Sequence, residues 1–338
     1  MMATTPQLTR KSSTPWERLK PAKHDPLQSM GFVSKGDTRL LDVKVQESFY
    51  NKIVARYMQF CTHHSIDMES AFASLSLEDD VSASSDPARN PPVAPVLPGQ
   101  GRPITPSPPK RVSSSPLQGG APSTPPPPAQ ELSIILLALR KLREALLATS
   151  SSAPSPVFSQ RVHVFCVRLA ILAFHPPSYH PPLMHLLFVL HTPRCPLPAP
   201  ELSEMTTYLI LDLACRQQEL ASAFSLRSNS RLQKDYRSRN VDEIIKAVVT
   251  SNWVAFWRVR RNVDGYVRAL MQWSVPSLRR NSLKALSRAY LSCDLEWVLQ
   301  SATGAEMSWE ELVKIENIGW VLEGSKVIVR KPKPKTNP

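Results

Sequence analysis

The sequence predicts an all-α protein, an array of packed helices that ends in a small module of helices and a hairpin. Between Asn240 and Tyr290, apolar residues recur at steps of three and four, which places each group on one helix face. Further on, Ser308-Trp-Glu-Glu311 is typical of a capping box that opens a short helix. Two short alternating runs around Gly324-Ser325 then predict a hairpin.

The chain opens with a polar segment, residues 1–37, that we expect to be disordered because it is rich in proline and shows little periodicity. Residues 38–77 should form the first helices of the array. One apolar stripe there runs through Val45, Phe49, Ile53, Tyr57 and Phe60, and a second through Ile66, Met68, Phe72 and Leu75.

Residues 78–130 are predicted to be a disordered insertion within the array. Their composition is dominated by Pro, Ser, Ala and Gly, and it ends in Thr124-Pro-Pro-Pro-Pro128. Such a segment cannot bury enough apolar surface to offset the entropy lost on ordering. We therefore expect the helical array to continue on its far side.

Residues 131–286 should form the main part of the array. Glu131–Ala148 is amphipathic, whereas Phe158–Phe174 is apolar on nearly every side and should be buried. Proline ends several helices, because the residue before it avoids the helical region. The further expected features are a turn bracketed by Pro176-Pro177 and Pro181-Pro182, a short helix at Leu183–His191, a break at Arg194–Pro200, a helix at Leu202–Ser225, a capping box at Asn240–Glu243 and a break at Pro276.

Residues 287–331 have the outline of a winged helix, followed by a basic tail at residues 332–338. The outline is three helices and then a hairpin made by Trp320–Glu323 and Lys326–Arg330. A helical-repeat (TPR-like) array capped by a C-terminal winged helix is the plan of a PCI domain.

Several segments resemble the SAC/GANP/THP family of PCI proteins, in the same order along the chain. Asp42-x-x-Val45-Gln46, with Phe49-Tyr50 and Ala55-Arg56 after it, is similar to the family's D-L-x-V-Q and Y-E-x-x-A-R segments. Glu204-Met-Thr-x-Tyr208-x-Ile-Leu211 is similar to E-F-T-x-Y-x-I-L. The densest likeness is Ser251-Asn-Trp-x-x-Phe-Trp-Arg258, then Tyr266 and Leu270-Met271, then Arg279-Arg280-x-x-Leu283-Lys-Ala285.

The likeness covers residues 38–77, 201–226 and 240–330, and it favours the shorter, mRNA-processing branch, here with long insertions. The family's K-S-I-R-Q segment is not legible. The resemblance implies a non-enzymatic scaffold in nuclear mRNA biogenesis, located in the nucleus with the cytoplasm as a further location. Its partners would be a second PCI-domain protein and a small acidic subunit, and paired winged helices would bind RNA or DNA.

Two other functions stay open at this stage. One is a PCI subunit of the signalosome, the proteasome lid or a translation initiation factor. The other is a winged-helix regulator that binds specific DNA, which the acidic helix Ser308–Asn317 disfavours because a recognition helix must approach bases between phosphates.

Composition supports a polyanionic partner. The formal net charge is +13 over 338 residues, which favours nucleic acid. The five cysteines are scattered and never form C-x-x-C, which argues against disulfides and a zinc site. The N-terminus has no apolar signal core, and no apolar run is long enough to span a bilayer, so we expect no membrane partner.

The residues of enzymes and cofactor sites are not evident. The densest histidine cluster has gaps of five and six residues across two proline pairs, which gives no common face for a metal. Phosphate-loop, nucleophile-elbow and zinc-protease motifs do not occur. We expect no catalysis, no cofactor, no metal and no small-molecule substrate. The cluster comprises His175, His180, His185 and His191, with Cys195 beyond it.

Charge placement suggests where nucleic acid would bind. Between Phe256 and Tyr290 there are eight basic residues and one acidic residue, a local charge of +7. The alternative is a solvated helix face with a basic tail. The tryptophans, including Trp297, could stack on bases, but their helical spacing favours core packing. The predicted nucleic-acid residues are Arg279, Arg280, Lys284, Arg288, Lys326, Arg330, Lys331 and Lys333. The predicted partner-interface residues, on the hairpin, are Trp320, Leu322, Val327 and Val329.

Overall fold

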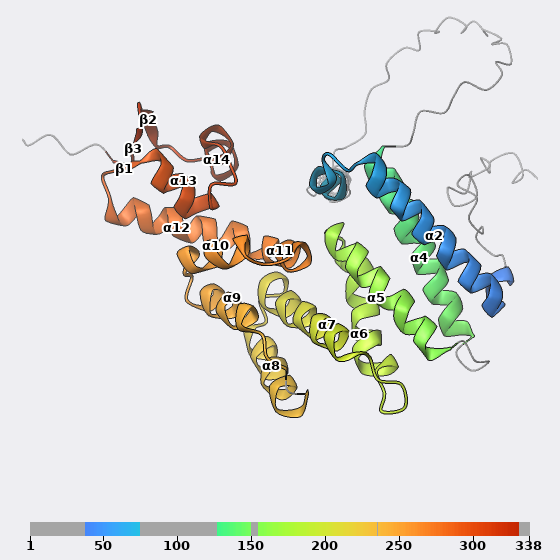
Figure 1. Ribbon diagram of the computed structural model, residues 1–338. Coiled ribbons are helices and arrows are strands. Elements are labelled where there is room, and N and C mark those ends of the chain that lie inside the picture. Colours follow the sequence, from blue (N-terminus) through green and yellow to red (C-terminus); the bar gives the residue numbers. More distant parts are fainter. Residues whose placement is uncertain (1–37, 75–126, 150–154, 235, 331–338) are drawn as a thin grey trace, which may run out of the picture.

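The computed structural model describes residues 38–74, 127–149, 155–234 and 236–330 (Figure 1). This part of the chain is mostly helical, in agreement with the predicted class, and carries one small sheet. Its α-helices are α2 Val43–His63, α4 Pro128–Ala148, α5 Pro156–Leu172, α6 Pro176–His185, α7 Ala199–Leu211, α8 Leu220–Lys234, α9 Arg239–Val249, α10 Trp253–Arg261, α11 Gly265–Met271, α12 Val275–Ala289, α13 Leu295–Thr303 and α14 Trp309–Glu316.

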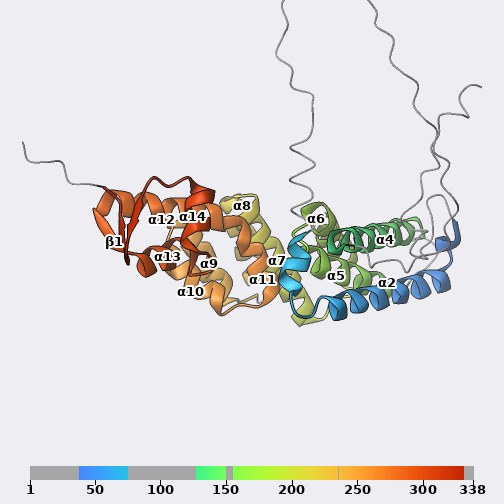
Figure 2. The same cartoon turned by 90° about the horizontal axis from the view of Figure 1, so that it is seen from above.

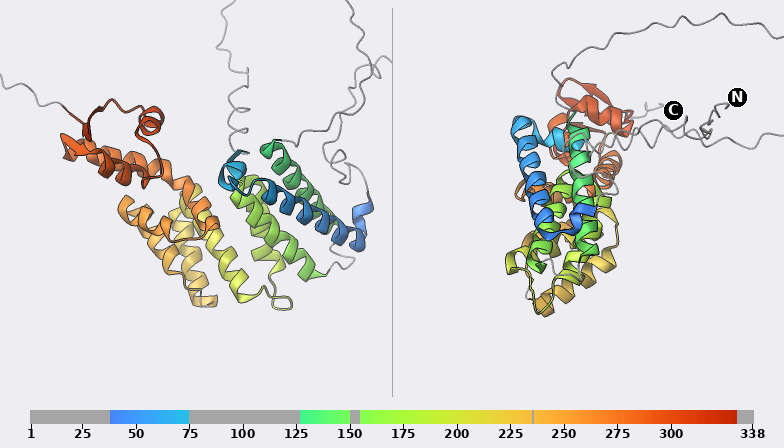
Figure 3. Two further views of the ribbon diagram at one scale, coloured as in Figure 1. Left: turned by 45° about the horizontal axis from the view of Figure 1, so that its top comes forward. Right: turned by 90° about the vertical axis from the view of Figure 1, so that its right-hand side faces the viewer.

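The helices are arranged along one long axis (Figure 2), with α2 and α4 at one end and the sheet at the other. Figure 3 shows successive helices side by side from the blue α2 to the orange α9. Short turns of other helix types join them: 3₁₀ turns at Thr38–Leu41 and Gln272–Ser274, and π-helical turns at Leu186–Leu190 and Asp212–Arg216. The segment predicted to be disordered at residues 1–37, the predicted basic tail at residues 332–338, and all but the last residues of the insertion predicted at 78–130 lie outside the described residues.

Helix α2 forms where the first stripe predicts it. Asp42 caps it, because its carboxylate accepts the backbone N–H of Lys44 at 3.0 Å. Phe49, Ile53 and Phe60 are buried, and α2 packs against α4. The second predicted stripe is only partly correct: residues 68–74 are helical, but Ile66 lies in the preceding turn and is fully exposed.

Helix α4 begins at Pro128, three residues earlier than Glu131, so residues 128–130 belong to the helix and not to the insertion. A proline is favourable at the first helical position, because its missing N–H would have no intrahelical acceptor there. Helix α5 is buried on nearly all sides, as predicted, between α4, α6 and α11.

The prediction of a turn between the two proline pairs is wrong, since both pairs lie in α6. Pro176 opens the helix, and Pro181 and Pro182 lie inside it. Pro182 has no N–H for the carbonyl of Ser178 four residues earlier. The thiol of buried Cys166 contacts that carbonyl instead, with Sγ 3.6 Å from the oxygen. Contacts from a neighbouring helix therefore offset part of the cost of an internal proline.

The single helix predicted at Leu202–Ser225 is interrupted. Helix α7 ends at the π-helical turn Asp212–Arg216, and Gln218 then adopts a left-handed conformation with φ of 60° before α8 begins. The π turn leaves the carbonyl of Cys215 to accept a hydrogen bond from Ser274 at 3.3 Å, which links this turn to the start of α12.

Capping side chains set the starts of α9 to α11. The predicted capping box at Asn240 is wrong, because Ser238 caps α9 and accepts the N–H of Val241 at 3.5 Å. Asn252 caps α10, and Asp264 caps α11. The break predicted at Pro276 is confirmed, since a 3₁₀ turn separates α11 from α12 and Pro276 lies in the first turn of α12.

After α12 the chain forms a terminal module whose order is β1, α13, α14, β2, β3. Strands β1 (Ser292–Asp294), β2 (Val321–Glu323) and β3 (Lys326–Ile328) pair antiparallel in the order β1-β3-β2. The hairpin and the capping box of Ser308 and Glu311 are confirmed. Strand β1 was not predicted.

Two apolar cores meet on α12. Val275 and Leu278 belong to the core of the array, whereas Leu283 and Leu286 belong to that of the terminal module. The predicted domain boundary at residues 286 and 287 therefore falls inside this helix. Because α12 contributes to both cores, it fixes the module on the array.

A buried joint on α10 strengthens this connection. The indole Nε1 of Trp257 donates to the carbonyl of Ser301 in α13 at 3.1 Å. Arg260, almost fully buried, donates from Nη1 to the carbonyl of Arg268 at 2.9 Å and pairs through Nε with Glu306 at 3.0 Å. These contacts tie α13 and the loop after it to α10, and so help to hold the module on the array.

Candidate nucleic-acid interface

Three basic side chains lie on the solvent face of α12. Arg280, Lys284 and Arg288 are exposed, as their four-residue spacing predicts, while Leu283 and Leu286 point into the module core. Helix α12 contains no acidic residue. Nothing within the helix therefore neutralises the three cations, which makes them available to an anion.

The end of the hairpin adds a fourth cation. The backbone N–H groups of Val329 and Arg330 both donate to the carbonyl of Leu291, at 2.9 and 3.1 Å. The guanidinium of Arg330 reaches back to the carbonyl of Ser287. This arrangement places Arg330 along the last turn of α12. We call Arg280, Lys284, Arg288 and Arg330 the basic ridge.

The turn between α9 and α10 lies beside the start of the ridge, next to Arg280. Asn281 donates from Nδ2 to the hydroxyl of Ser251 at 3.2 Å, which holds the turn against the first half of α12. The ridge is thus bounded by neutral groups on this side. It follows α12 from Arg280 near its start to Arg288 in its last turn.

The structure does not bring Arg279 into this surface. Arg279 is buried, with Nε 3.3 Å from a Glu316 carboxylate oxygen and Nη1 3.5 Å from the sulfur of Met307. A buried guanidinium held by a carboxylate serves to dock α14 on α12. Sequence spacing missed this because Arg279 and Arg280 are adjacent, yet about 100° apart around the helix.

Lys326 is also separated from the basic ridge. In the sheet it lies between Asp294 of β1 and Glu323 of β2, in register with both. All three side chains are exposed, so the two acids offset the charge of the lysine. Predicted residues Lys331 and Lys333 lie outside the described residues.

The four predicted partner residues lie on the face of the hairpin that packs on the module core, so they do not form an exposed patch. Val327 is fully buried, and Trp320 and Val329 are half-buried against the module core, where they stabilise the sheet. Leu322 is exposed on β2. Val321, beside it, is exposed too and was not predicted, although the pairing of Val321 with Ile328 places it on the outer face.

The histidine cluster is dispersed in the structure. The Nδ1 of His180 lies 3.2 Å from a carboxylate oxygen of Asp212, and the Nδ1 of His191 accepts the backbone N–H of Leu197 at 3.1 Å. These two rings thus have separate structural partners. Within the described ranges no group of three or more His, Cys, Asp or Glu residues could hold a metal ion.

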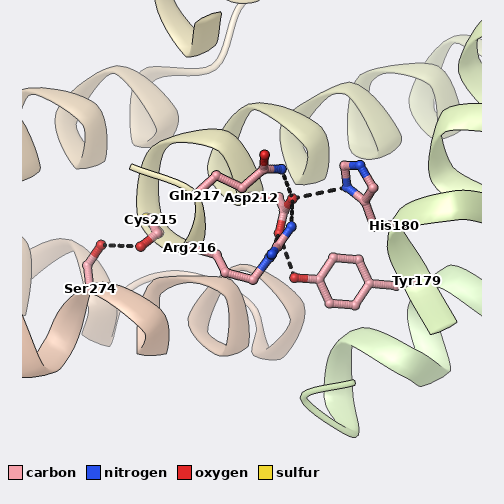
Figure 4. A network of polar contacts seen from close by, with 7 residues as sticks. All are labelled: Tyr179, His180, Asp212, Cys215, Arg216, Gln217 and Ser274. Carbon is pink, nitrogen blue, oxygen red and sulfur yellow. Dashed lines mark hydrogen bonds and ion pairs between the residues drawn. The ribbon is translucent and has the colours of Figure 1, made fainter. Parts of the chain in front are cut away.

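A polar network that the sequence did not reveal surrounds the fully buried Asp212 (Figure 4). The Tyr179 hydroxyl donates to Oδ1 at 2.6 Å, Arg216 donates to both oxygens at 2.6 and 2.7 Å, and Gln217 donates to Oδ2 at 2.7 Å. Burial raises the pKa of this carboxyl, but the hydrogen bonds outweigh burial and hold the pKa below its usual value. The saturated carboxylate therefore joins α6 to the turn after α7 and is structural.

Residues that carry the family resemblance also join helices. Arg168 of α5 makes a two-pronged ion pair with Glu204 of α7, at 2.8 and 2.6 Å, and Tyr208 donates to the same carboxylate at 2.7 Å. Gln46 donates to the carbonyl of Leu40 at 2.8 Å. These positions are explained by helix packing without any ligand.

Comparison of the chain with protein-family models gave no match, and comparison with curated protein sequences gave none either. Within the described part of the chain, every helix is too short or too polar to cross a membrane.

Proposed function

We propose that this protein is a non-enzymatic PCI-type scaffold that binds the phosphate backbone of nucleic acid through the basic ridge. The observation that carries the proposal is the ridge itself: three exposed cations on α12 and a fourth just after β3, with no acid on α12. Such a surface binds phosphates by neutralising charge and releasing counterions, and it needs no base-specific contact.

The architecture supports a repeat array capped by a winged helix, which is the fold that this proposal requires. The order α12, β1, α13, α14, β2, β3 is that expected of a winged helix, with β3 between the other two strands. The side-by-side helices from α2 to α9 suit a TPR-like repeat array. An array capped by a winged helix is the PCI plan that the sequence resemblance implies.

The arrangement favours contact with the backbone over sequence-specific reading of DNA. Helix α14 is in the position of a recognition helix, but Glu310 and Glu311 are exposed in its first turn. Carboxylates there would repel the phosphates on both sides of a major groove. The scaffold function is therefore favoured over a DNA-binding regulator.

A second PCI-domain protein would pair with the terminal module through β2. This strand lies at one edge of the sheet, and Val321 and Leu322 are 48% and 37% exposed. An edge strand with exposed apolar side chains is a template for pairing with another chain. The two modules together would extend the basic surface, in a nuclear complex for mRNA biogenesis that also contains a small acidic subunit.

The test is affinity purification of the full-length chain from its own cells, followed by mass spectrometry. We expect a second PCI-domain protein, a small acidic subunit and factors of mRNA processing or export. Val321→Glu/Leu322→Glu should lose the PCI protein, whereas Ile315→Glu, at an exposed position of α14, should keep it. Recovery of signalosome, proteasome or translation factors instead would assign the chain to a different PCI assembly.

A further inference from the structure

Two aromatic side chains are exposed at the C-terminal end of the basic ridge. Tyr290 directly follows α12 and is 46% exposed, and Trp297 lies in the first turn of α13 and is 42% exposed. Their ring centroids are 5.2 Å apart and their planes meet at 72°. We call them the aromatic pair. Trp297 was predicted to be a core residue, and its exposure is not explained by packing.

The aromatic pair begins where the basic ridge ends. Tyr290 is two residues beyond Arg288. The neighbouring Leu291 carbonyl accepts the N–H of Arg330, whose guanidinium continues to Ser287. The two last cations of the ridge thus lie beside the start of the aromatic pair, so one bound chain could contact both.

We infer that the aromatic pair stacks against the bases of single-stranded nucleic acid whose phosphates follow the basic ridge. This inference rests on the proposed function and adds the class of strand. In a T-shaped pair the edge of one ring meets the face of the other, which leaves the far face of the second ring open. Unpaired bases can stack on such a face, whereas the bases of a duplex are already stacked on each other.

Charge distinguishes this reading from an apolar contact with a protein. Leu291 is 57% exposed beside the aromatic pair, so the patch is apolar as well as aromatic. Its ridge side is cationic, which suits a polyanion. Exposed Glu296 precedes Trp297 and would repel a phosphate there, so Glu296→Gln should tighten binding modestly.

The test measures binding by fluorescence anisotropy, using the full-length chain and three probes. The probes are single-stranded RNA, a duplex of the same sequence, and a single strand that lacks bases. Wild type should bind the first most tightly. Trp297→Ala should weaken that binding by about 5- to 100-fold. Trp297→Phe keeps an aromatic ring and should retain most of the wild-type affinity. Phe188→Ala, at a 62% exposed aromatic residue in the distant π-helical turn Leu186–Leu190, should change nothing.

Two further readouts isolate stacking from charge. Trp297→Ala should bind the abasic strand as wild type does, because that probe offers no base to stack. Its salt dependence should equal that of wild type, because no phosphate contact is lost. Tyr290→Ala should behave in the same way, with the size of its effect showing how the two rings share the base.

Each remaining outcome has a definite meaning. Equal affinity for all three probes, with no effect of Trp297→Ala, would overturn the stacking inference while leaving salt-dependent binding by the ridge intact. Absence of binding to every probe would overturn the proposed function as well. Aromatic variants that keep RNA affinity but lose a co-purifying protein would assign the pair to a protein interface, against the inference.

Discussion

At the residue scale, Gly304 shows how closely the terminal module is fitted to the array. It follows α13 with φ of 66°, and its N–H caps the helix by donating to the carbonyl of Gln300 at 3.2 Å. A Cβ added at this position would lie 2.7 Å from the indole of Trp257. Both the left-handed backbone and the close approach therefore require glycine.

We predict that Gly304→Ala lowers the free energy of unfolding by roughly 2–4 kcal/mol, from backbone strain plus overpacking. Gly324→Ala is the matched control, because Gly324 has φ of 60° but nothing within 4 Å of an added Cβ. It should cost only about 1–2 kcal/mol. Equal losses of unfolding free energy in the two variants, measured by urea unfolding, would show that the Trp257 side chain moves away from the added methyl group at no energetic cost.

The lowered pKa of buried His163 should make the stability of the protein depend on pH. Its Nδ1 lies 2.8 Å from the carbonyl of Ser159, and burial lowers its pKa from 6.5 to about 4, with His185 and Arg143 adding to the effect. Between pH 6.5 and about 4, His163 is therefore mostly neutral in the folded protein but mostly protonated in the unfolded chain. Stability should be complete above this pH and fall as the pH drops towards 4.

The loss attributable to His163 should reach about 3 kcal/mol. His163→Gln should flatten the decline between pH 6.5 and 4, because glutamine does not titrate and can still donate to the carbonyl. Val167→Ala, a change at a buried non-titrating residue of the same helix, should lower stability about equally at each pH. A His163→Gln profile as steep as that of wild type would place the proton uptake elsewhere.

At the element scale, the basic side chains of α12 have two different roles, one in packing and one at the surface. Arg279 docks α14 through its buried ion pair with Glu316, whereas Arg280 faces solvent. Removal of one member of a buried pair leaves a charge without compensation. Removal of an exposed charge has little effect on stability.

We therefore predict that Arg279→Met costs about 3 kcal/mol of folding free energy, and Arg280→Met less than about 0.5 kcal/mol. In folded protein at low temperature, only Arg280→Met should alter the salt dependence of RNA binding. Chemical denaturation and anisotropy together check the assignment. A reversed pattern would return Arg279 to the binding surface.

Periodicity predicted most helices but not their local exceptions. Apolar steps of three and four located α2, α4, α5 and the helices from α9 to α12, because burial of one face sets that spacing. The helical prolines of α6 and the π turn at Asp212 depend on contacts with distant residues such as Cys166 and Tyr179. No local pattern encodes those contacts.

The start of α9 illustrates the same limit on a smaller scale. Ser238 and Asn240 are both good capping residues, so the sequence offers two starts. Tyr236 is buried, and its hydroxyl lies 2.7 Å from that of Thr207 on α7. This anchor fixes the chain just before Ser238, which then becomes the cap.

The sequence correctly predicted the part of the candidate site that depends on helix spacing alone. The line of Arg280, Lys284 and Arg288 needed only the helical period. The burial of Arg279 and the exposure of Trp297 depend on where α14 and α13 pack. Periodicity indicates which residues share a face, but it does not say whether another element covers that face.

At the scale of the whole molecule, α12, which carries most of the basic ridge, lies in the half of an elongated structure that ends in the sheet (Figure 2). Helix α12 is part of both cores, so the ridge is held rigidly on the array. A scaffold with this layout could join protein contacts on the module to nucleic acid on the adjoining face. In the function proposed for this protein, the ridge supplies the phosphate contacts.

The most direct measurement of that claim is RNA affinity across a salt series for wild type and Arg280→Glu/Lys284→Glu/Arg288→Glu. The control is Lys44→Glu/Lys52→Glu/Arg140→Glu, which changes net charge equally at exposed positions of α2 and α4. Each lost phosphate contact flattens the slope of log K against log salt by about 0.7–0.9. The ridge variant should therefore lose about two units of slope, while the control keeps the wild-type slope. Equal slopes and affinities in all three folded proteins would contradict the account and reduce the ridge to a solvated helix face.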